Sequence, residues 1–189
     1  MTERWRCFVA VPLDDALRAA LQLACRSWAD RPDLAEVRWS EPTAWHLTLV
    51  FIGDVDAGAV PNLEAIIREV AAGHRAMQLP AGGVGAFPTP ARARVAWYGV
   101  EDPGARLAGL AADLSEALGV AGDEPYRPHI TLARAPGRPL DLRRWVIDAA
   151  EAVPASIVVD RIEVLRSLHG RGPAAYETLA SMPLPESPR

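Results

Sequence analysis

Two copies of one short motif, 83 residues apart (129 − 46 = 83), constrain the fold of this chain more than any other feature. They read His46-Leu47-Thr48-Leu49 and His129-Ile130-Thr131-Leu132. In a β-strand successive side chains point to opposite faces, so the histidine and threonine of each copy share one face and the aliphatic residues share the other. The aliphatic face can anchor in a core. Two of the polar faces brought together would line one cleft with two imidazoles and two hydroxyls.

The elements expected around the two copies repeat the order strand, helix, motif strand, helix. Strands are expected at 5–11, 37–40, 46–52, 76–81, 94–100, 129–134, 157–165 and 174–181, a loop or bulged strand at 82–92, and helices after Asp14 or Asp15, after Asp56, at 104–118 and at 140–150. This order predicts an internal duplication, with two α+β lobes of strands and helices related by an approximate two-fold axis. We expect one bilobal unit over 1–183, with halves at about 1–75 and 76–183, the terminal strands as candidates for exchange between lobes, and a flexible tail at 184–189.

The composition is that of an ordinary folded domain. Half of the 189 residues are hydrophobic and 23% are charged, which is typical of a globular protein and not of a disordered one. No apolar run approaches the roughly 20 residues of a membrane span, and the run 7–11 is too short for a signal peptide, so we expect a cytoplasmic protein without membrane contact. The net charge of −4 argues against a broad nucleic-acid-binding surface.

Three other kinds of catalytic site find little support in the sequence. Two histidines fall short of the three or four protein ligands typical of zinc, and no His-x-x-x-His or Cys-x-x-Cys motif adds to them. There is no Gly-x-Ser-x-Gly motif, and Cys7 and Cys25 are expected to be buried free thiols. Neither a Walker motif nor Gly-x-Gly-x-x-Gly is present. We therefore expect no metal and no cofactor.

What remains is acid–base chemistry by the two imidazoles. With a free pKa of about 6.5, one neutral histidine can accept a proton from water while a protonated one donates to a leaving oxygen. This pair suits in-line displacement at phosphorus, with the hydroxyls of Thr48 and Thr131 hydrogen-bonded to the non-bridging oxygens. Arg127 or Arg134 can stabilise the charge that develops there. The favoured substrate is one whose phosphorus is already activated, such as a strained cyclic phosphodiester.

At these residues the chain resembles the RNA 2′,3′-cyclic phosphodiesterases of the two-histidine (2H) phosphoesterase superfamily, once called 2′-5′ RNA ligases. The matching segments are 6–12, 37–39, 46–49 continuing to 51–53, 87–88, 95–97, 127–134, and Ser167, Gly172 and Tyr176 near the end. The resemblance implies a bilobal α+β fold with both motifs lining a central cleft. It also implies that water opens the 2′,3′-cyclic phosphate of an RNA end or of a small cyclic nucleotide, leaving a 2′-phosphate and a free 3′-hydroxyl.

The resemblance also implies roles for single residues. His46 would be the proton donor to the 3′ oxygen and His129 the proton acceptor, whereas the residues by themselves leave the two roles open. Thr48, Thr131 and Arg134 occupy the positions of the phosphate contacts. Two alternatives use the same cleft: the reverse reaction, which joins a cyclic phosphate end to a 5′-hydroxyl, and a nucleotide- or RNA-end-binding module with little turnover. No obligate protein partner is expected.

The remaining expectations concern the borders of the cleft. Val50, which shares the face of the motif threonine in a regular strand, stands where the resembling proteins often carry Lys or Arg. Phe87 and Tyr176 are candidates to stack a base, although a packing role explains each equally well. His169 and Arg171 lie in a glycine-rich loop that either borders the cleft or lies on the surface.

Overall fold

The protein forms one antiparallel sheet with helices packed against it, as seen in a computed structural model that describes residues 3–120, 125–151, 153–168 and 174–186. Its elements are β1 (Arg4–Pro12), α1 (Asp15–Trp28), η1 (Pro32–Leu34), β2 (Arg38–Trp39), η2 (Pro42–Ala44), β3 (His46–Asp56), η3 (Ala57–Ala59), α2 (Val60–Gly73), β4 (Met77–Phe87), η4 (Pro90–Arg92), β5 (Val95–Val100), α3 (Arg106–Ala117), β6 (His129–Arg134), α4 (Arg143–Asp148), β7 (Ala155–Val159), β8 (Arg161–Leu168) and β9 (Ala175–Pro183). This mixture of helices and antiparallel strands confirms the expected α+β class.

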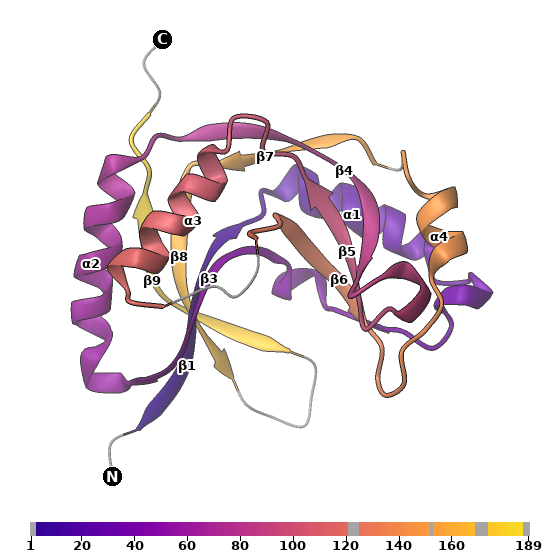
Figure 1. Cartoon of the computed structure of the whole chain (residues 1–189), viewed down its shortest axis with the longest axis horizontal. Helices are drawn as coiled ribbons and strands as arrows, with labels where there is room; N and C mark the ends of the chain where they lie inside the picture. Colours follow the sequence, from indigo (N-terminus) through magenta and orange to yellow (C-terminus); the bar gives the residue numbers. More distant parts are fainter. Residues whose placement is uncertain (1–2, 121–124, 152, 169–173, 187–189) are drawn as a thin grey trace.

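The strand order is β7-β4-β5-β6-β3-β1-β8-β9, with β2 paired to β6. The two motif strands, β3 and β6, are neighbours at the middle of the sheet. We call β3, β1, β8 and β9 the first half-sheet and β6, β5, β4 and β7 the second half-sheet. In Figure 1 the two half-sheets diverge from this junction, each with its own pair of helices.

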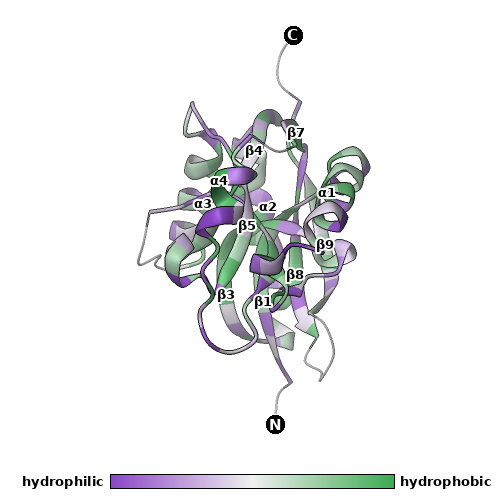
Figure 2. Cartoon of the chain, turned by 90° about the vertical axis from the view of Figure 1, so that its right-hand side faces the viewer, coloured by the Kyte–Doolittle hydropathy of each residue, from purple (hydrophilic) through white to green (hydrophobic). Residues whose placement is uncertain are grey.

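Each half of the chain contributes one α-helix to each half-sheet. α2 contacts β9 and α3 contacts β3, so both lie on the first half-sheet, whereas α1 contacts β7 and α4 contacts β4 of the second (Figure 1). The core formed between the helices and the sheet is continuous from one half-sheet to the other. In Figure 2 the hydrophobic colour is concentrated on the central strands and the hydrophilic colour on the outer loops. Among the described residues, no helix is both long and apolar enough to cross a membrane.

Helix α1 shows how local sequence signals determine an element. Asp14 is the N-cap, and its Oδ1 accepts a hydrogen bond of 2.8 Å from the Leu17 backbone N–H. The buried residues follow at a spacing of three or four, which is typical of an amphipathic helix, and are Leu17, Leu21, Ala24 and Trp28. This stripe packs α1 into the core, where Trp28 meets Trp145 of α4 edge-on at 5.5 Å between ring centroids.

The region 157–165, expected to be one long strand, is two strands that belong to different half-sheets. β7 pairs with β4 and β8 pairs with β1, and the chain passes from one half-sheet to the other at Asp160. Asp160 is exposed, and its carbonyl accepts a hydrogen bond of 2.7 Å from the backbone N–H of Leu184. The expectation of one strand was wrong because the polar pair Asp160-Arg161, which interrupts the apolar residues at this change of partner, was included in a single strand.

Three further boundaries differ from expectation. Asp56 caps the short helix η3, accepting from the Gly58 backbone N–H at 2.9 Å, and α2 begins after it at Val60. The fourth helix is shorter than the expected 140–150 and covers Arg143–Asp148. Leu184, expected at the start of a flexible tail, is buried, and the carbonyl of the next residue accepts the Ala76 backbone N–H at 2.7 Å. The chain is therefore held in place beyond β9.

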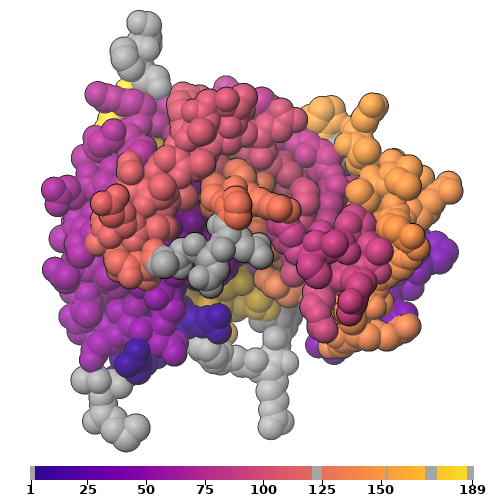
Figure 3. Space-filling model, viewed as in Figure 1, coloured from indigo at the N-terminus to yellow at the C-terminus, as the bar shows by residue number. Residues whose placement is uncertain are grey.

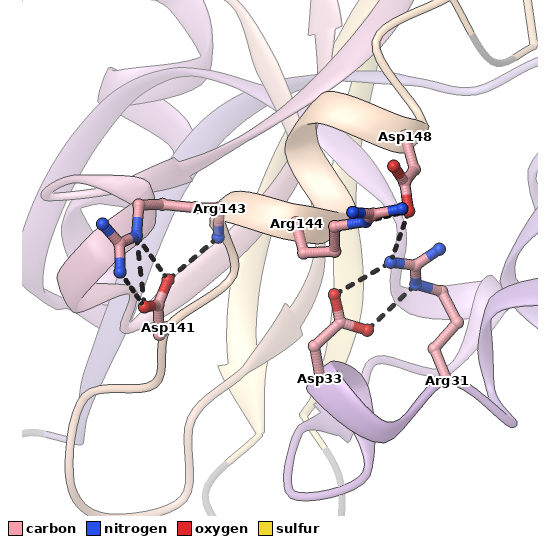
Figure 4. A network of polar contacts seen from close by, with 6 residues as sticks. All are labelled: Arg31, Asp33, Asp141, Arg143, Arg144 and Asp148. Atoms are coloured by element: carbon pink, nitrogen blue, oxygen red, sulfur yellow. Dashed lines mark hydrogen bonds and ion pairs between the residues drawn. The ribbon is translucent and has the colours of Figure 1, made fainter.

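A network of ion pairs joins α4 to the segment that follows α1 (Figure 4). Arg31 bonds Asp33 at 2.9 Å and Asp148 at 3.1 Å, and Arg144 reaches Asp148 at 2.9 Å. Arg144 and Arg31 together lower the pKa of the Asp148 carboxyl. Arg144 is largely exposed and the other three side chains are partly exposed, so salt screens the attraction and we expect the network to add little to stability.

A glycine on β4 makes room for a tryptophan on β5. Gly85 is the cross-strand partner of Trp97, and a Cβ at Gly85 would lie 2.2 Å from the Cζ2 atom of that indole. Trp97 is in turn the partner of Thr131 on β6, so the indole lies on the face of the motif side chains.

We predict that Gly85→Ala lowers the free energy of unfolding by about 1–3 kcal/mol, because the indole must move to admit the methyl group. Urea denaturation measures this change. The matched control is Gly109→Ala in α3, where a Cβ meets nothing within 4 Å and the greater helix propensity of alanine should stabilise by up to about 1 kcal/mol. An equal loss in both variants would contradict the steric explanation.

Candidate active site

The junction between the half-sheets brings the two motifs together. Leu47 of β3 and Ile130 of β6 are antiparallel partners, and neither side chain is exposed. In an antiparallel pair the residue numbers rise on one strand as they fall on the other, so residues opposite each other have the same sum of residue numbers (47 + 130 = 46 + 131 = 48 + 129). Each motif histidine therefore lies across from the threonine of the other motif. The aliphatic residues anchor the junction in the core, and the polar face opens on the opposite side.

His46 is held by a hydrogen bond and by two aromatic rings. Its Nδ1 lies 2.8 Å from the carbonyl oxygen of Ala44, the last residue of η2. The ring packs against Phe8 of β1 at 4.9 Å between centroids and edge-on against Tyr176 of β9 at 5.0 Å. Because a carbonyl can only accept, Nδ1 carries the proton and Nε2 is the nitrogen left for a ligand.

His129 repeats this arrangement on the other side of the junction. Its Nδ1 donates to the carbonyl oxygen of Arg127 at 2.7 Å, again two residues earlier in the chain. Phe87 meets the ring edge-on at 4.9 Å, and the indole of Trp97 lies 6.3 Å away. Both histidines thus have the same tautomer when neutral, with Nε2 free of protein hydrogen bonds among the described residues.

The surroundings of both imidazoles disfavour their charged forms. Burial lowers the pKa of His46 to about 4, with the Ala44 carbonyl acting in the opposite direction and the charges of Arg134 and His129 lowering it further. Burial, and then Arg134, also lowers the pKa of His129. The charge of Arg134 therefore opposes protonation of both rings. Without a ligand both histidines are therefore neutral at pH 7, and an anion between them would raise both pKa values.

A bulge in β3 corrects the expected position of Val50. Ala10 pairs with Thr48 but Val9 pairs with Val50, so Leu49 is an extra residue in β3. Leu49 and Val50 are both buried in the main core, and Phe51 takes the face of Thr48 instead. The expectation that Val50 faces the cleft was wrong, because it assumed a regular strand.

The other motif strand contains the same bulge. Trp97 pairs with Thr131 but Ala96 pairs with Ala133, so Leu132 is the extra residue in β6. The exposed side chain of Arg134 thus returns to the face of Thr131. Arg134 and Phe51 occupy equivalent places, each three residues after a motif threonine.

A pocket of about 560 Å³ opens beside the motifs. The described residues that line it are Thr48, Leu49, Phe51, Phe87, Pro88, Arg94, Val95, Pro125, Tyr126, Arg127 and His129. In the space-filling view this face of the molecule is hollowed between the two half-sheets (Figure 3). The expected contacts Arg127 and Phe87 belong to the lining. Tyr176 does not; its ring packs edge-on against the rings of both Phe8 and His46.

Several lining residues were not expected from the sequence. The Tyr126 hydroxyl donates to the Thr48 carbonyl at 3.0 Å and so ties the segment before β6 to β3. Phe51 could have been found by aligning the two motifs beyond their fourth residue, which matches it to Arg134. Nothing in the sequence indicates Tyr126 or Arg94.

The expected glycine-rich loop near the cleft lies outside the described residues. It contains His169 and Arg171, together with Gly172 of the late matching segment.

Within the described ranges no group of three His, Cys, Asp or Glu side chains is arranged to hold a metal ion. Cys7 and Cys25 are free thiols, and burial raises the pKa of Cys25 to about 12.

Comparisons with known proteins find relatives of this chain. The family model of the 2′-5′ RNA ligase superfamily matches residues 15–171. The chain is 34% identical to a protein named RNA 2′,3′-cyclic phosphodiesterase from Methanothermobacter thermautotrophicus, covering 70% of this chain and 72% of that one. A protein of the same name from Thermus thermophilus is also 34% identical, over 88% of this chain and 93% of its own length.

Solved structures show the same fold. Escherichia coli LigT in complex with 3′-AMP superposes with a TM-score of 0.73 at 26% identity, covering 96% of this chain and 99% of LigT. TT0787 of Thermus thermophilus gives a TM-score of 0.76 at 28% identity, covering 96% of this chain and 98% of its own. The extent of the family match and the shared fold show that the chain belongs to the 2′-5′ RNA ligase superfamily.

Proposed function

We propose that this protein is a metal-independent RNA 2′,3′-cyclic phosphodiesterase that uses His46 and His129 as an acid–base pair. The observation that carries the proposal is the matched pair of imidazoles, each with Nδ1 bonded to the carbonyl two residues earlier, across the Leu47–Ile130 junction. The names of the relatives from Methanothermobacter and Thermus support the substrate class. The crystal structure of LigT with 3′-AMP supports a nucleotide as the kind of ligand.

In the proposed reaction water attacks the phosphorus of the cyclic phosphate. Nε2 of neutral His129 accepts the proton of this water, and Nε2–H of protonated His46 donates to the departing 3′ oxygen. The products are a 2′-phosphate and a free 3′-hydroxyl. The hydroxyls of Thr48 and Thr131 donate to the non-bridging oxygens, and Arg134 stabilises the negative charge that develops there.

The low pKa of His46 places a condition on its role as proton donor. In the free protein this ring is neutral at pH 7, because it is buried and lies near Arg134. The negative charge of a bound phosphodiester opposes both effects and raises the pKa. When the ring is protonated, its Nδ1–H keeps the Ala44 carbonyl as acceptor while Nε2–H faces the substrate. Substrate binding thus supplies the charged form that the acid step needs.

A first prediction concerns the overall reaction. Hydrolysis of 2′,3′-cyclic AMP should persist in excess EDTA and give 2′-AMP, because the proposed proton transfers need only side chains. Chromatography that separates 2′-AMP from 3′-AMP measures the product. Loss of activity in EDTA, or 3′-AMP as the product, would contradict the mechanism. Adding an oligonucleotide with a 5′-hydroxyl shows whether the reverse joining reaction also occurs.

A second prediction separates the two histidine roles. His46→Ala and His129→Ala should each lower kcat for 2′,3′-cyclic AMP by at least about 10²-fold. With bis(4-nitrophenyl) phosphate, whose nitrophenolate leaves without protonation, His46→Ala should cost much less while His129→Ala keeps its full effect. The opposite pattern would exchange the roles. His74→Ala is the control, because His74 pairs with Asp113 at 2.9 Å, away from the pocket lining.

A third prediction concerns pH. Because kcat/KM reports pKa values of the free protein, where both histidine pKa values are lowered, its maximum should lie below pH 6.5, the free value of imidazole. The kcat profile reports the substrate complex, where the anion raises both values, and should lie at higher pH. Initial rates across pH 4–9 test this. Superimposed or flat profiles would contradict the proposed pair.

A further inference from the structure

The two strands that carry the motif histidines are joined directly by very little backbone pairing. In the described strands the ladder between β3 and β6 has one pair, Leu47 with Ile130. The same register would place Pro128 opposite Leu49, and proline has no backbone N–H with which to extend the ladder. A contact that adds to this single pair would therefore help to hold the two imidazoles at a fixed separation.

The side chain of Tyr126 supplies such a contact from the segment before β6. Its hydroxyl donates to the carbonyl oxygen of Thr48 on β3 at 3.0 Å. The partly buried ring packs against the main core. Burial raises the pKa of Tyr126 above its ordinary value, so the hydroxyl stays a protonated donor at neutral pH. Tyr126 thus adds a hydrogen bond to β3 close to where the backbone ladder stops.

The backbone that follows Tyr126 leads directly to the second imidazole. The carbonyl oxygen of the next residue, Arg127, accepts from Nδ1 of His129 at 2.7 Å. Arg127 precedes Pro128, and a residue before proline is restricted to extended conformations. The carbonyl of Pro128 in turn accepts the backbone N–H of Val100 at 3.3 Å. A short, restrained stretch of chain therefore connects the tyrosine hydroxyl to the group that orients His129.

We propose that Tyr126 is a positioning residue for His129: its bond to β3 fixes the Arg127 carbonyl, which keeps the imidazole in the Nδ1–H tautomer. This rests on the proposed function and names the group that keeps the proposed base ready. Only in this tautomer is Nε2 unprotonated and able to accept the proton of the attacking water. Tyr126 itself transfers no proton, because its hydroxyl is bonded to the Thr48 carbonyl.

The first test measures steady-state rates of the whole chain with 2′,3′-cyclic AMP. Tyr126→Phe keeps the ring in the pocket lining and removes only the hydroxyl. It should lower kcat about 10- to 100-fold, since a misplacement of about 1 Å can cost about 10²-fold in rate. KM should change little, because no contact to the substrate is removed.

Tyr98→Phe is the matched control for this variant. Tyr98 is fully buried, its hydroxyl donates to the Val153 carbonyl, and it lies outside the pocket lining. Both variants lose one hydroxyl-to-carbonyl hydrogen bond and should lower the midpoint of urea denaturation. The control should nevertheless keep the wild-type kcat and KM. An equal fall of kcat in both variants would mean that the hydroxyl of Tyr126 acts on stability alone.

A second test reads the tautomer of His129 without any turnover. Nitrogen-15 NMR at pH 8, where both motif histidines are neutral, distinguishes a ring protonated at Nδ1 from one protonated at Nε2. In the wild type His46 and His129 should both carry Nδ1–H. Tyr126→Phe should convert His129 to a mixture of the two tautomers, whereas His46, held by the Ala44 carbonyl, stays unchanged. The Tyr98→Phe control should alter neither ring.

The proposal is overturned if His129 keeps the pure Nδ1–H tautomer in Tyr126→Phe, if it carries Nε2–H in the wild type, or if the variant has the wild-type kcat. A wild-type protein that does not hydrolyse 2′,3′-cyclic AMP would instead overturn the proposed function. The NMR comparison would then still decide whether Tyr126 positions the ring.

Discussion

The pairing of Leu47 with Ile130 is the contact on which the rest of the structure depends. It joins the two half-sheets, and its fully buried side chains anchor the junction in a core that both share. Because the register is antiparallel, the same contact sets each motif histidine opposite the other motif's threonine. A shift by one residue would turn both polar faces into the core. Fold and candidate site are thus determined by one register.

Around this contact, the protein keeps both imidazoles uncharged until a ligand arrives. Rings of Phe8 and Tyr176 cover His46, and rings of Phe87 and Trp97 lie beside His129. Burial lowers both pKa values and Arg134 adds to this effect. In the proposed mechanism, the same guanidinium that disfavours protonation of the empty site would attract the substrate phosphate, whose charge reverses that effect. Binding and proton transfer would then be coupled by electrostatics.

The features that could be predicted from the sequence are those that depend only on a local pattern of residues. The apolar spacing of α1 and the alternation within the two motifs gave the helix stripe and the two-faced strands, and the repeated element order gave the α+β class. The bulges at Leu49 and Leu132 could not be predicted, because they depend on pairing with strands distant in sequence. For this reason Val50 was placed on the wrong face and Phe51 was missed. The catalytic roles of His46 and His129 stay predictions.

The chain crosses from the second half-sheet to the first at Asp160, and this late crossing affects how the protein can fold while it is being synthesised. β1 is made before the other strands, yet one of its two neighbours in the sheet is β8, which follows that crossing. Phe8 and Ala10 of β1 complete their small apolar cluster only with Leu165 of β8. This cluster lies under His46, because Phe8 contacts that ring. A nascent chain released from the ribosome before β8 would contain both motifs and still lack the floor of the cleft.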